Sequence, residues 1–240
     1  MRPEGGASAS AGAGTNADRK RTFLRSPKAS ALTGLITLVV GLSLTVLFAG
    51  GTEMSTDLYL AAAGTELFEI GYVVSEVVLL VLVASWGLAA IVLALRRSLR
   101  RLVLLVIGGV GAVVAYASSE LLKLLIANTR PCNAYEVVVA SCPPVENWSY
   151  PSNHTVIAWA LAIALIAAVP RAGVLVVPAA LLAGSARVFA GHHYPHDVLG
   201  GTLVGVSITV ALILLTAPAV LLALSRCRAT MGASKFLSSS

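Results

Sequence analysis

Six long apolar stretches, separated by short polar segments, dominate the chain. They occupy residues 30–50, 71–95, 102–126, 154–170, 173–190 and 198–223. A helix needs about 20 mostly apolar residues to cross the hydrocarbon core of a bilayer. The pattern therefore predicts an all-α, polytopic membrane protein in which residues 30–225 form a bundle of six transmembrane helices. Only Pro170, Arg171 and Ala172 separate the fourth and fifth stretches, which predicts a tight helical hairpin.

The composition narrows the class of protein in the same direction. Hydrophobic residues make up 57% of the 240 residues and charged residues 12%, whereas about 25% of a soluble domain is charged. So few charges cannot cover a surface that faces water. The composition excludes a soluble globular domain, a disordered protein, a coiled coil and a disulfide-dense secreted module.

The two ends of the chain differ from the apolar body. Residues 1–29 are rich in Ala, Gly and Ser with scattered Arg and Lys, and we expect a disordered cytoplasmic tail there. A cleaved signal peptide is the alternative, but the basic segment is long for one and Leu47 suits a cleavage site poorly. We therefore interpret the first apolar stretch as an uncleaved anchor, and residues 226–240 as a second cytoplasmic tail.

The distribution of charge gives the orientation. The net charge of +6 suggests a nucleic-acid partner at first sight, but all but three of the 17 basic residues lie in the two tails, at 96–101 and at Arg171. The positive-inside rule then places both termini in the cytoplasm. The predicted outer loops carry acidic residues instead: Glu53, Asp57, Glu66, Glu69, Glu136 and Glu146. The basic bias thus reflects topology, and we expect membrane lipids as partners and no nucleic acid.

Lys123, Arg130 and Arg187 are the three exceptions, and all lie near the predicted outer ends of helices. Charge at membrane depth is costly and usually functional. Lys123 and Arg130 are seven residues apart, which places them on one helix face, and Pro131 should end the helix at Arg130. Two cations on one face suit a phosphate group; the alternative is that they reach up to lipid headgroups.

Polar residues also stand at the start of the fourth and sixth apolar stretches. Pro151-Ser152-Asn153-His154 offers good N-cap residues, and free N–H groups at a helix start bind anions. The alternative is an ordinary cap with a solvated His. Farther along, His193 and Asp197 are four residues apart, so one helical turn would bring the carboxylate to the imidazole. Pro195 suits the first turn of the sixth helix, and His192 and His196 are interpreted as polar residues at the interface.

Together these motifs resemble the signature of a known family. Lys-x6-Arg-Pro, Pro-Ser-x-His and Arg-x5-His-x3-Asp, in this order, are similar to the motifs of the type-2 phosphatidic acid phosphatases. These are integral membrane lipid phosphatases that share an active-site plan with the vanadium haloperoxidases. The resemblance covers residues 70–225 and implies a six-helix bundle with its active site at the extracytoplasmic ends of the helices.

The resemblance also implies roles for individual residues. His193 would attack phosphorus, Asp197 would orient His193, and His154 would protonate the leaving group and then activate water. The phosphoryl oxygens would be held by these residues: Lys123, Arg130, Arg187, Ser152 and the backbone near Asn153. Three cations and a helix start can neutralise those oxygens without a metal, so we expect no metal and no other cofactor.

Two positions depart from the family pattern. The family often has Gly where Asn153 stands, and we expect a working loop because Asn tolerates a positive φ better than most residues. It often has Ser where Ala186 stands, so one hydrogen bond to phosphate would be missing, with Ser185 one place earlier.

Other candidates have weaker support. Glu120 precedes Lys123 by three residues and can pair with it. For Glu120 and Glu76 we favour a structural contact over a role in substrate binding. Glu120 and His192 remain secondary candidates for the site. Cys132 and Cys142 lie ten residues apart in one predicted outer loop, and this spacing leaves open both a disulfide and two free thiols.

These residues favour a lipid phosphatase acting on a phosphate or pyrophosphate at the extracytoplasmic face of the cell membrane. Minimal outer loops and a compact body suit a polyprenyl carrier lipid, such as undecaprenyl or decaprenyl pyrophosphate. Phosphatidylglycerophosphate, phosphatidic acid and a polyprenyl-phosphosugar remain alternatives, because the motifs recognise phosphate and not the tail. The sequence gives no indication of oligomeric state.

Two hypotheses from other classes compete. An intramembrane protease or metal enzyme is disfavoured, because the chain has no HExxH helix and the adjacent His192 and His193 cannot readily bind one ion. A non-catalytic lipid-binding or transport protein on the same scaffold would not need the complete set of nucleophile, acid and orienting carboxylate.

Overall fold

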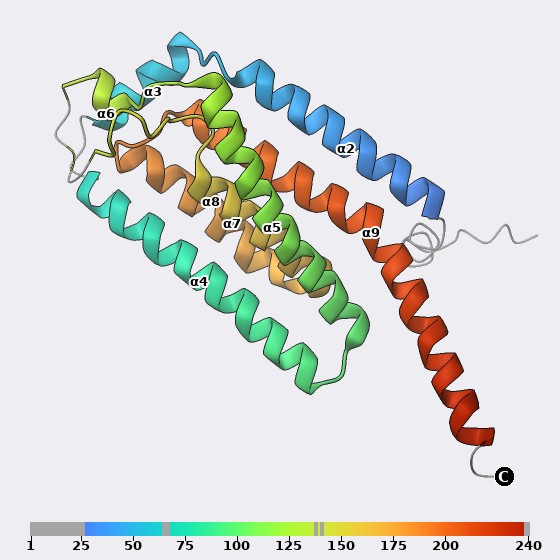
Figure 1. Cartoon of the computed structure of the whole chain (residues 1–240). Coiled ribbons are helices and arrows are strands. Elements are labelled where there is room, and N and C mark those ends of the chain that lie inside the picture. The colour runs from blue at the N-terminus through green and yellow to red at the C-terminus, as the bar shows by residue number, and fades with distance from the viewer. Residues whose placement is uncertain (1–26, 64–67, 137–138, 140–141, 238–240) are drawn as a thin grey trace, which may run out of the picture.

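The chain folds into a bundle of helices (Figure 1). The computed structural model describes residues 27–63, 68–136, 139 and 142–237, without the side chains of 68, 69 and 228–237. The predicted tail up to residue 26, Glu66 and the side chain of Glu69 therefore lie outside the described residues. Within the described part the helices are α2 (Pro27–Phe48), α3 (Glu53–Ala63), α4 (Phe68–Leu95), α5 (Leu99–Ile126), α6 (Pro131–Ala134), α7 (Asn153–Ala168), α8 (Gly173–Phe189) and α9 (Pro195–Leu237), with a 3-10 turn, η1, at Pro170–Ala172.

All six apolar stretches of the sequence form helices, and the described residues contain no β-strand. Five of these helices, α2, α4, α5, α8 and α9, belong to segments long and apolar enough to cross a membrane. The sixth, α7, has 16 residues and is shorter. The all-α class is confirmed, and the chain is a multi-pass membrane protein; the count of six spans and the orientation stay predictions.

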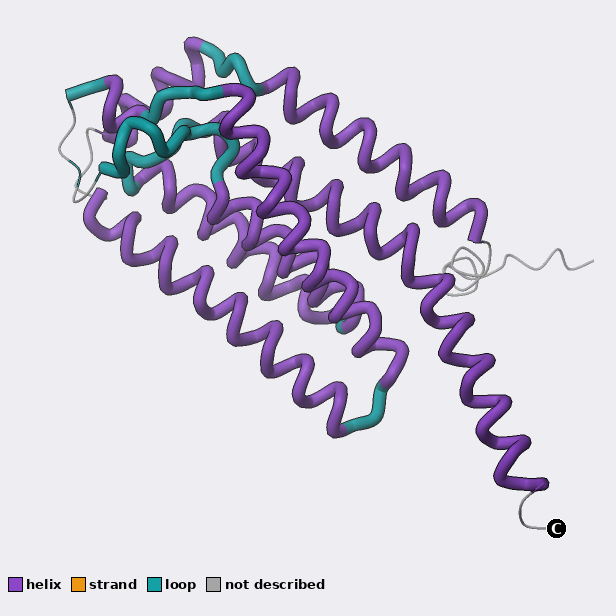
Figure 2. The backbone as a smooth tube through the Cα atoms, in the orientation of Figure 1, coloured by secondary structure: helices purple, strands orange, loops and turns teal. Residues whose placement is uncertain are grey.

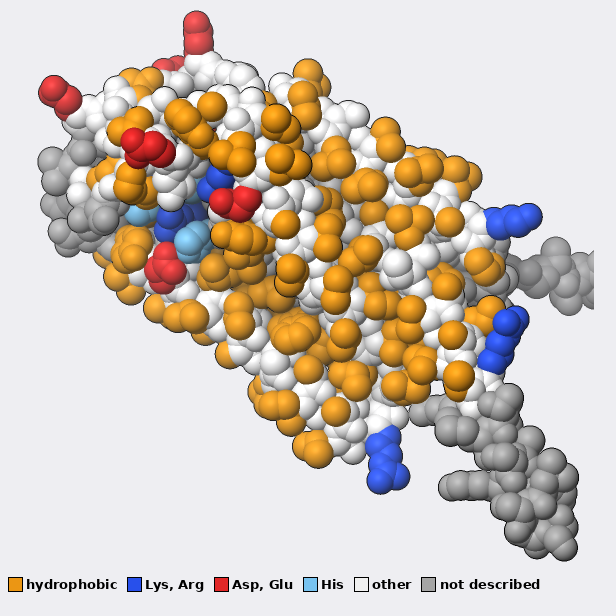
Figure 3. Space-filling view, in the orientation of Figure 1, with side chains coloured by type: hydrophobic (Ala, Val, Ile, Leu, Met, Phe, Trp, Pro, Cys, Tyr) orange, Lys and Arg blue, Asp and Glu red, His pale blue; other side chains and the backbone are white. Residues whose placement is uncertain are grey.

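The short helix α7 lies at the centre of the bundle (Figure 2). It packs against α4, α5, α8 and α9, while α2 packs along α9 and α4 along α8. Small side chains such as Ala158, Ala160, Ala162 and Ala164 are fully buried along α7, and small residues let helix backbones approach closely within a membrane. By contrast, large apolar side chains on the outer helices are exposed, as expected for a surface that faces lipid (Figure 3).

Two glycines of α9 fix its distance from α7. A Cβ atom on Gly201 would lie 2.6 Å from the carbonyl oxygen of Ser152, and one on Gly205 would lie 2.5 Å from that of Val156. Both distances are too short for a side chain, so the backbones of the two helices touch at the start of α7. This contact holds Ser152 and His154 close to the start of α9.

The observed helix boundaries match the predicted ones in two places and differ from them in one. The hairpin at Pro170–Ala172 and the start of α9 at Pro195 are confirmed. The prediction that Lys123 and Arg130 share a helix face is wrong, because α5 ends at Ile126, where Ala127 takes a left-handed conformation (φ 53°) and its N–H bonds to the Lys123 carbonyl. Arg130 lies beyond the helix in extended backbone (φ −66°, ψ 146°), as a residue before proline prefers.

Tertiary contacts explain why α5 stops early. The side-chain amide of Asn128 donates to the Ala49 carbonyl at 2.7 Å, and the Asn128 carbonyl accepts the Ser149 N–H at 2.8 Å.

At the C-terminal side of the chain, α9 continues as a helix through Leu237, past residue 226, where the C-terminal tail is predicted to begin.

The polar groups separate to the two ends of the bundle. The ends of α5 and α8 and the starts of α7 and α9 meet beside α3 and α6 (Figure 1). A disulfide joins Cys132 and Cys142, whose Cα atoms are 6.0 Å apart, at this end. Figure 3 shows acidic, basic and histidine side chains together there, while the other visible basic side chains lie at the opposite end.

We predict that Gly201→Ala lowers thermal stability, because the added methyl group forces α9 away from Ser152. Such overpacking costs about 1–3 kcal/mol, which a melting curve of the purified protein in detergent would detect. Gly87→Ala is the matched control, since a Cβ there meets no atom within 4 Å. Equal melting temperatures for the two variants would contradict the close contact of α7 and α9.

Candidate active site

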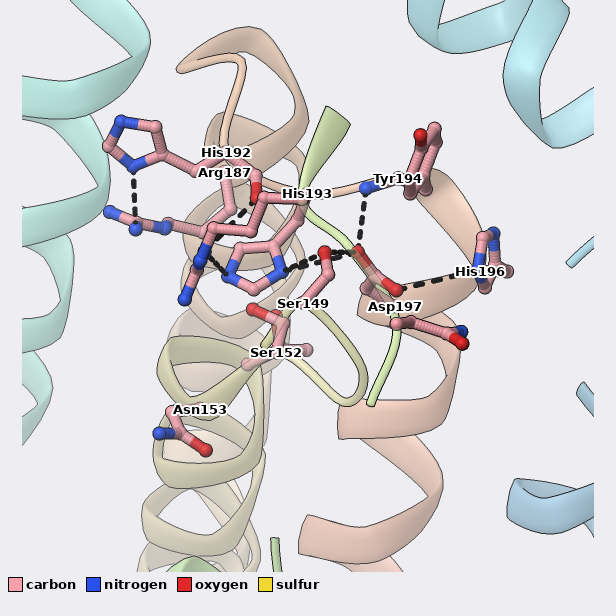
Figure 4. A network of polar contacts seen from close by, with 12 residues as sticks. Ser149, Ser152, Asn153, Arg187, His192, His193, Tyr194, His196 and Asp197 are labelled. Carbon is pink, nitrogen blue, oxygen red and sulfur yellow. Dashed lines mark hydrogen bonds and ion pairs between the residues drawn. The ribbon is translucent and has the colours of Figure 1, made fainter. Parts of the chain in front are cut away.

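His193 lies at the centre of a network of polar contacts in the segment between α8 and α9 (Figure 4). Its side chain is 2% exposed. Its Nδ1 atom is 3.3 Å from Asp197 Oδ2, and its Nε2 atom is 3.0 Å from Arg130 Nη1. The ring is therefore held on both nitrogens, by a carboxylate on one side and by a guanidinium group on the other.

These two partners determine the tautomer of His193. A guanidinium group can only donate hydrogen bonds, so Nε2 must accept from Arg130 and carries the lone pair. Nδ1 then carries the proton and donates it to Asp197. Complete burial and the charges of Arg130, Arg187 and Lys123 lower the pKa of His193 well below its usual value, which keeps the ring neutral at physiological pH.

Asp197 is fully buried and is itself tightly bound. Its Oδ2 atom accepts a short hydrogen bond from the Ser149 hydroxyl and one of 2.8 Å from the Tyr194 N–H. The other oxygen, Oδ1, lies 3.4 Å from Nε2 of His196. The predicted pairing with His193 is present, although His193 precedes α9 and the two residues do not share a regular helical turn.

Arg130 reaches the same point from the segment between α5 and α6. Its Nη1 atom also donates to the His192 carbonyl at 3.1 Å. Its Nε and Nη2 atoms donate to the backbone and side chain of Asn147 at 2.7 and 2.9 Å. The guanidinium plane is thus fixed by the loop that precedes α7, with one edge against the His193 lone pair.

Arg187 enters the cluster from the last turn of α8. Its Nη2 atom is 2.8 Å from His192 Nδ1, and its Nη1 atom is 3.3 Å from both Ser75 Oγ and Glu76 Oε1. Its Nε atom is buried and has no hydrogen-bond partner among the described residues. A buried donor without a partner is costly, and a phosphoryl oxygen would satisfy it.

The remaining predicted residues lie on the neighbouring helices α5 and α7. Lys123 is buried, with Nζ 3.5 Å from Glu120 Oε1. His154, in the first turn of α7, places Nε2 2.8 Å from Glu76 Oε1. Because Glu76 also contacts Arg187, these contacts connect His154 to the cations around His193.

Ser152 and Asn153 differ in detail from expectation. Ser152 is the N-cap residue of α7 but makes no capping hydrogen bond with its side chain, and its Oγ accepts from the Thr155 hydroxyl at 3.1 Å. Asn153 is the first residue of α7 and has no positive φ, so the expected tolerance for that conformation is not used. Its side chain accepts from Ser119 Oγ at 2.6 Å and donates to Glu120, and Figure 4 shows it apart from the network around His193.

Ser185 does not take the place of the serine missing at Ala186. Its hydroxyl donates to the Leu181 carbonyl at 3.0 Å on the exposed side of α8. Within the described ranges, no group of three or more His, Cys, Asp and Glu side chains is arranged as a metal site requires.

The comparison with known families decides the classification. The family model of the PAP2 superfamily matches residues 102–221, which is half of the chain. The chain belongs to the PAP2 superfamily. Its resemblance to the type-2 phosphatidic acid phosphatases is thereby confirmed.

Individual relatives share part of this PAP2 chain. Undecaprenyl-diphosphatase BcrC of Bacillus subtilis is 34% identical over 100 residues, which cover 42% of this chain and 51% of BcrC. The decaprenylphosphoryl-5-phosphoribose phosphatase of Mycobacterium tuberculosis is 34% identical over 126 residues, 52% of this chain and 67% of the relative. The match to BcrC thus spans about half the length of that protein.

A solved structure gives a more distant comparison. The crystal structure of a transmembrane PAP2-type phosphatidylglycerolphosphate phosphatase from Bacillus subtilis superposes with a TM-score of 0.49 at 20% sequence identity. The superposition covers 76% of this chain and 94% of that one.

Three residues of this PAP2 site were not predicted from the sequence. Ser149 lies two residues before Pro151, where the Pro-Ser-x-His motif begins, and this position is the one sequence signal that could have indicated it. Glu76 was interpreted as a structural contact between helices. His196 was interpreted as an interfacial residue, yet it contacts Asp197 and, through Nδ1 at 2.9 Å, Ser55 of α3.

We predict that Ser149→Ala lowers kcat for phosphate-ester hydrolysis about tenfold or more. The variant removes the short hydrogen bond from Ser149 to the buried Asp197 Oδ2, which keeps only the Tyr194 N–H and His193 Nδ1 as partners. A hydrogen bond to a charged group contributes about 1.5–3 kcal/mol. KM should change little, because the Ser149 hydroxyl contacts Asp197 and His193 and none of the three cations. A rise in KM with an unchanged kcat would show that Ser149 serves substrate binding instead.

Proposed function

We propose that this protein is a membrane lipid phosphatase that hydrolyses a lipid phosphate or pyrophosphate through a phosphohistidine at His193. The observation that carries the proposal is the lone pair of His193 Nε2, which faces Arg130 in a buried cluster of cations. A neutral imidazole with its lone pair directed at an anion-binding group is a nucleophile in position. The roles of the other residues follow from their places around it.

The first step forms a phosphorus–nitrogen bond and breaks the bond from phosphorus to the leaving oxygen. Lys123, Arg130 and Arg187 neutralise the equatorial oxygens, where charge collects in phosphoryl transfer. Asp197 accepts the Nδ1 proton in a hydrogen bond and stabilises the positive charge that the ring gains. His154 donates a proton to the leaving oxygen, so that the lipid departs in neutral or singly protonated form.

The second step hydrolyses the phosphohistidine. His154, now without that proton, takes one from water while the water oxygen attacks phosphorus. The phosphorus–nitrogen bond breaks, its electron pair returns to Nε2, and inorganic phosphate leaves. The site is then restored to the arrangement seen in the structure.

A polyprenyl pyrophosphate is the substrate that we propose. Two of the relatives are named for polyprenyl substrates, an undecaprenyl diphosphate and a decaprenylphosphoryl-5-phosphoribose. Apolar side chains cover the sides of the bundle, so a long lipid tail can remain in the bilayer while the phosphate group meets the cations. A polyprenyl-phosphosugar is the second candidate, because the decaprenylphosphoryl-5-phosphoribose phosphatase is as similar to this chain, at 34% identity, as BcrC is.

The proposed orientation places the site outside the cytoplasm. Arg96 and Arg101 lie at the opposite end of the bundle, beside Val169 and Ala172, and Arg171 belongs to the η1 turn between those two residues. The positive-inside rule assigns that end to the cytoplasm. The pyrophosphate would then be cleaved at the extracytoplasmic face of the cell membrane.

The direct test is phosphate release by the purified protein in a chelator-containing buffer. The substrates are polyprenyl pyrophosphate, a polyprenyl-phosphosugar, phosphatidylglycerophosphate and phosphatidic acid. We expect release from at least one lipid, with polyprenyl pyrophosphate hydrolysed fastest. We also expect His193→Ala to abolish both release and the acid-labile label that 32P-substrate leaves on the wild-type protein. A labelled His193→Ala protein would reject the assigned nucleophile, and no release from any lipid would favour a non-catalytic lipid-binding protein.

The lowered pKa of His193 gives a prediction for pH dependence. Because the ring stays neutral below its usual titration range, its lone pair remains available in mildly acidic solution. The imidazole of His193 should therefore stay neutral between about pH 7 and pH 6, where an ordinary His becomes charged. NMR titration of the 15N-histidine-labelled protein, with His193→Ala identifying the signal, tests this, and a transition of His193 centred near pH 6.5 would contradict it.

A further inference from the structure

Glu76 belongs to none of the three sequence motifs and lies outside the matched residues 102–221. It nevertheless extends from α4 into the site, where the single oxygen Oε1 is 2.8 Å from His154 Nε2 and 3.3 Å from Arg187 Nη1. The side chains of His154 and Arg187 are 24% and 6% exposed, and that of Glu76 is 39% exposed. The carboxylate thus bridges the proposed acid and one of the proposed phosphate-binding cations.

The contact determines which nitrogen of His154 is available. A carboxylate accepts hydrogen bonds and does not donate them, so Nε2 carries a hydrogen that is directed at Glu76. The other ring nitrogen, Nδ1, has no hydrogen-bond partner in the described part of the chain. Nδ1 is therefore the atom left to exchange a proton with the leaving oxygen and with water.

We infer that Glu76 is the positioning residue for His154. The site then contains two carboxylate–imidazole pairs, and the carboxylate binds a different ring nitrogen in each pair. Asp197 binds Nδ1 of His193, so that the Nε2 lone pair, which faces Arg130, is the one that attacks phosphorus. Glu76 binds Nε2 of His154 and leaves Nδ1 for proton transfer. The inference rests on the proposed function, because His154 transfers a proton to a leaving group only if the protein catalyses phosphoryl transfer.

Arg187 connects this pair to substrate binding. In the structure it shares the Glu76 oxygen with His154. When phosphoryl oxygens occupy Arg187, the carboxylate loses that partner, and its negative charge acts on His154 alone. A carboxylate beside imidazole favours the protonated ring, so binding of substrate itself favours the acid that the first step needs.

The test compares two esters of nearly equal size, phenyl phosphate and p-nitrophenyl phosphate. The nitro group makes the phenolate a much better leaving group, so its departure needs no proton from the enzyme. We expect Glu76→Gln to slow phosphoenzyme formation from phenyl phosphate about tenfold or more, and that from p-nitrophenyl phosphate less than about threefold. Glu76→Asp, which keeps the charge, should restore part of the loss.

Two comparisons separate this role from a structural one. Glu120→Gln, which removes the carboxylate beside Lys123, should leave the ratio of the two rates unchanged. In a His154→Ala background, Glu76→Gln should cause no further loss, because Glu76 acts through His154. Equal slowing of both esters by Glu76→Gln would overturn the inference, and faster reaction of both would show that Glu76 competes with phosphate for Arg187. If wild-type protein hydrolyses neither ester nor any lipid, the proposed function itself fails.

A second site lies at the opposite end of the bundle and is independent of the first. A pocket of about 490 Å³ opens between α4, the start of α5, α7 and α8. Its walls are apolar, with Leu88, Val92, Leu165 and Leu175 among them, whereas Arg96, Ser98 and Arg101 line its rim. No acidic residue lines the pocket, so the rim carries only positive charge.

The turn between α4 and α5 brings these rim residues together. Arg97 takes a left-handed conformation (φ 53°), and the N–H groups of Arg97 and Ser98 bond to the carbonyls of Ala94 and Leu93 at 2.9 Å. This closes α4 with the helix-ending arrangement that usually contains Gly. α5 then starts at Leu99 without a side-chain cap from Ser98, and the positive end of its helix dipole adds to the attraction for an anion.

We propose that this pocket binds an anionic phospholipid of the surrounding leaflet, with the phosphate at Arg96 and Arg101 and an acyl chain along the apolar walls. The positive charge of the rim favours an anionic over a zwitterionic headgroup. The apolar walls favour a ligand that also carries an acyl chain to cover them. Free phosphate satisfies the first requirement and not the second.

Thermal unfolding of the purified protein in neutral detergent tests this site. Phosphatidylglycerol should raise Tm, whereas phosphatidylcholine and inorganic phosphate should not. The Arg96→Gln/Arg101→Gln double variant should lose the shift, while Arg100→Gln, which removes an exposed charge of the same helix outside the pocket, should retain it. Loss of the shift in Arg100→Gln, or an equal shift with phosphatidylcholine, would overturn the proposal.

Discussion

Three positive charges are held close together in a place with little water, and this constraint shapes the end of the bundle where the starts of α7 and α9 meet. Lys123, Arg130 and Arg187 are each no more than 5% exposed. Buried charges of one sign repel one another and lose hydration, so each must be fixed by partners. Glu120, the Asn147 loop and Glu76 supply those partners. The arrangement has the charge to receive a phosphate, and the buried Nε of Arg187 still lacks a hydrogen-bond partner among the described residues.

The two histidines use this environment in different ways. His193 is fully enclosed, and the nearby cations keep it neutral and direct its lone pair at Arg130. His154 lies closer to the surface beside Glu76, where a carboxylate can support its charged form. In the proposed mechanism, these different neighbours make one histidine the nucleophile and the other the acid. The close contact of α7 with α9 at Gly201 holds the start of α7, with His154, against the start of α9.

Local spacing explains how much could be predicted from the sequence. The apolar stretches are long, so the helices were predictable, and the His193–Asp197 pair was found because four residues separate them in a short segment. Arg130 was placed wrongly, because the end of α5 depends on contacts of Asn128 with Ala49 and Ser149 from distant parts of the chain. Glu76 belongs to no motif, and only the packing of α4 against α7 brings it to His154. Ser149 lies near the Pro-Ser-x-His motif, but its contact with Asp197 depends on how the loop before α7 folds against the start of α9.

The most direct measurement of the central claim is an experimental structure of the protein with vanadate, an oxyanion that adopts the geometry of phosphoryl transfer. The account predicts vanadium bonded to Nε2 of His193, with its oxygens contacting Lys123, Arg130 and Arg187 and the apical oxygen beside His154. Vanadate bound elsewhere, or at this site but without a bond to His193, would contradict the assignment of the nucleophile and its cations.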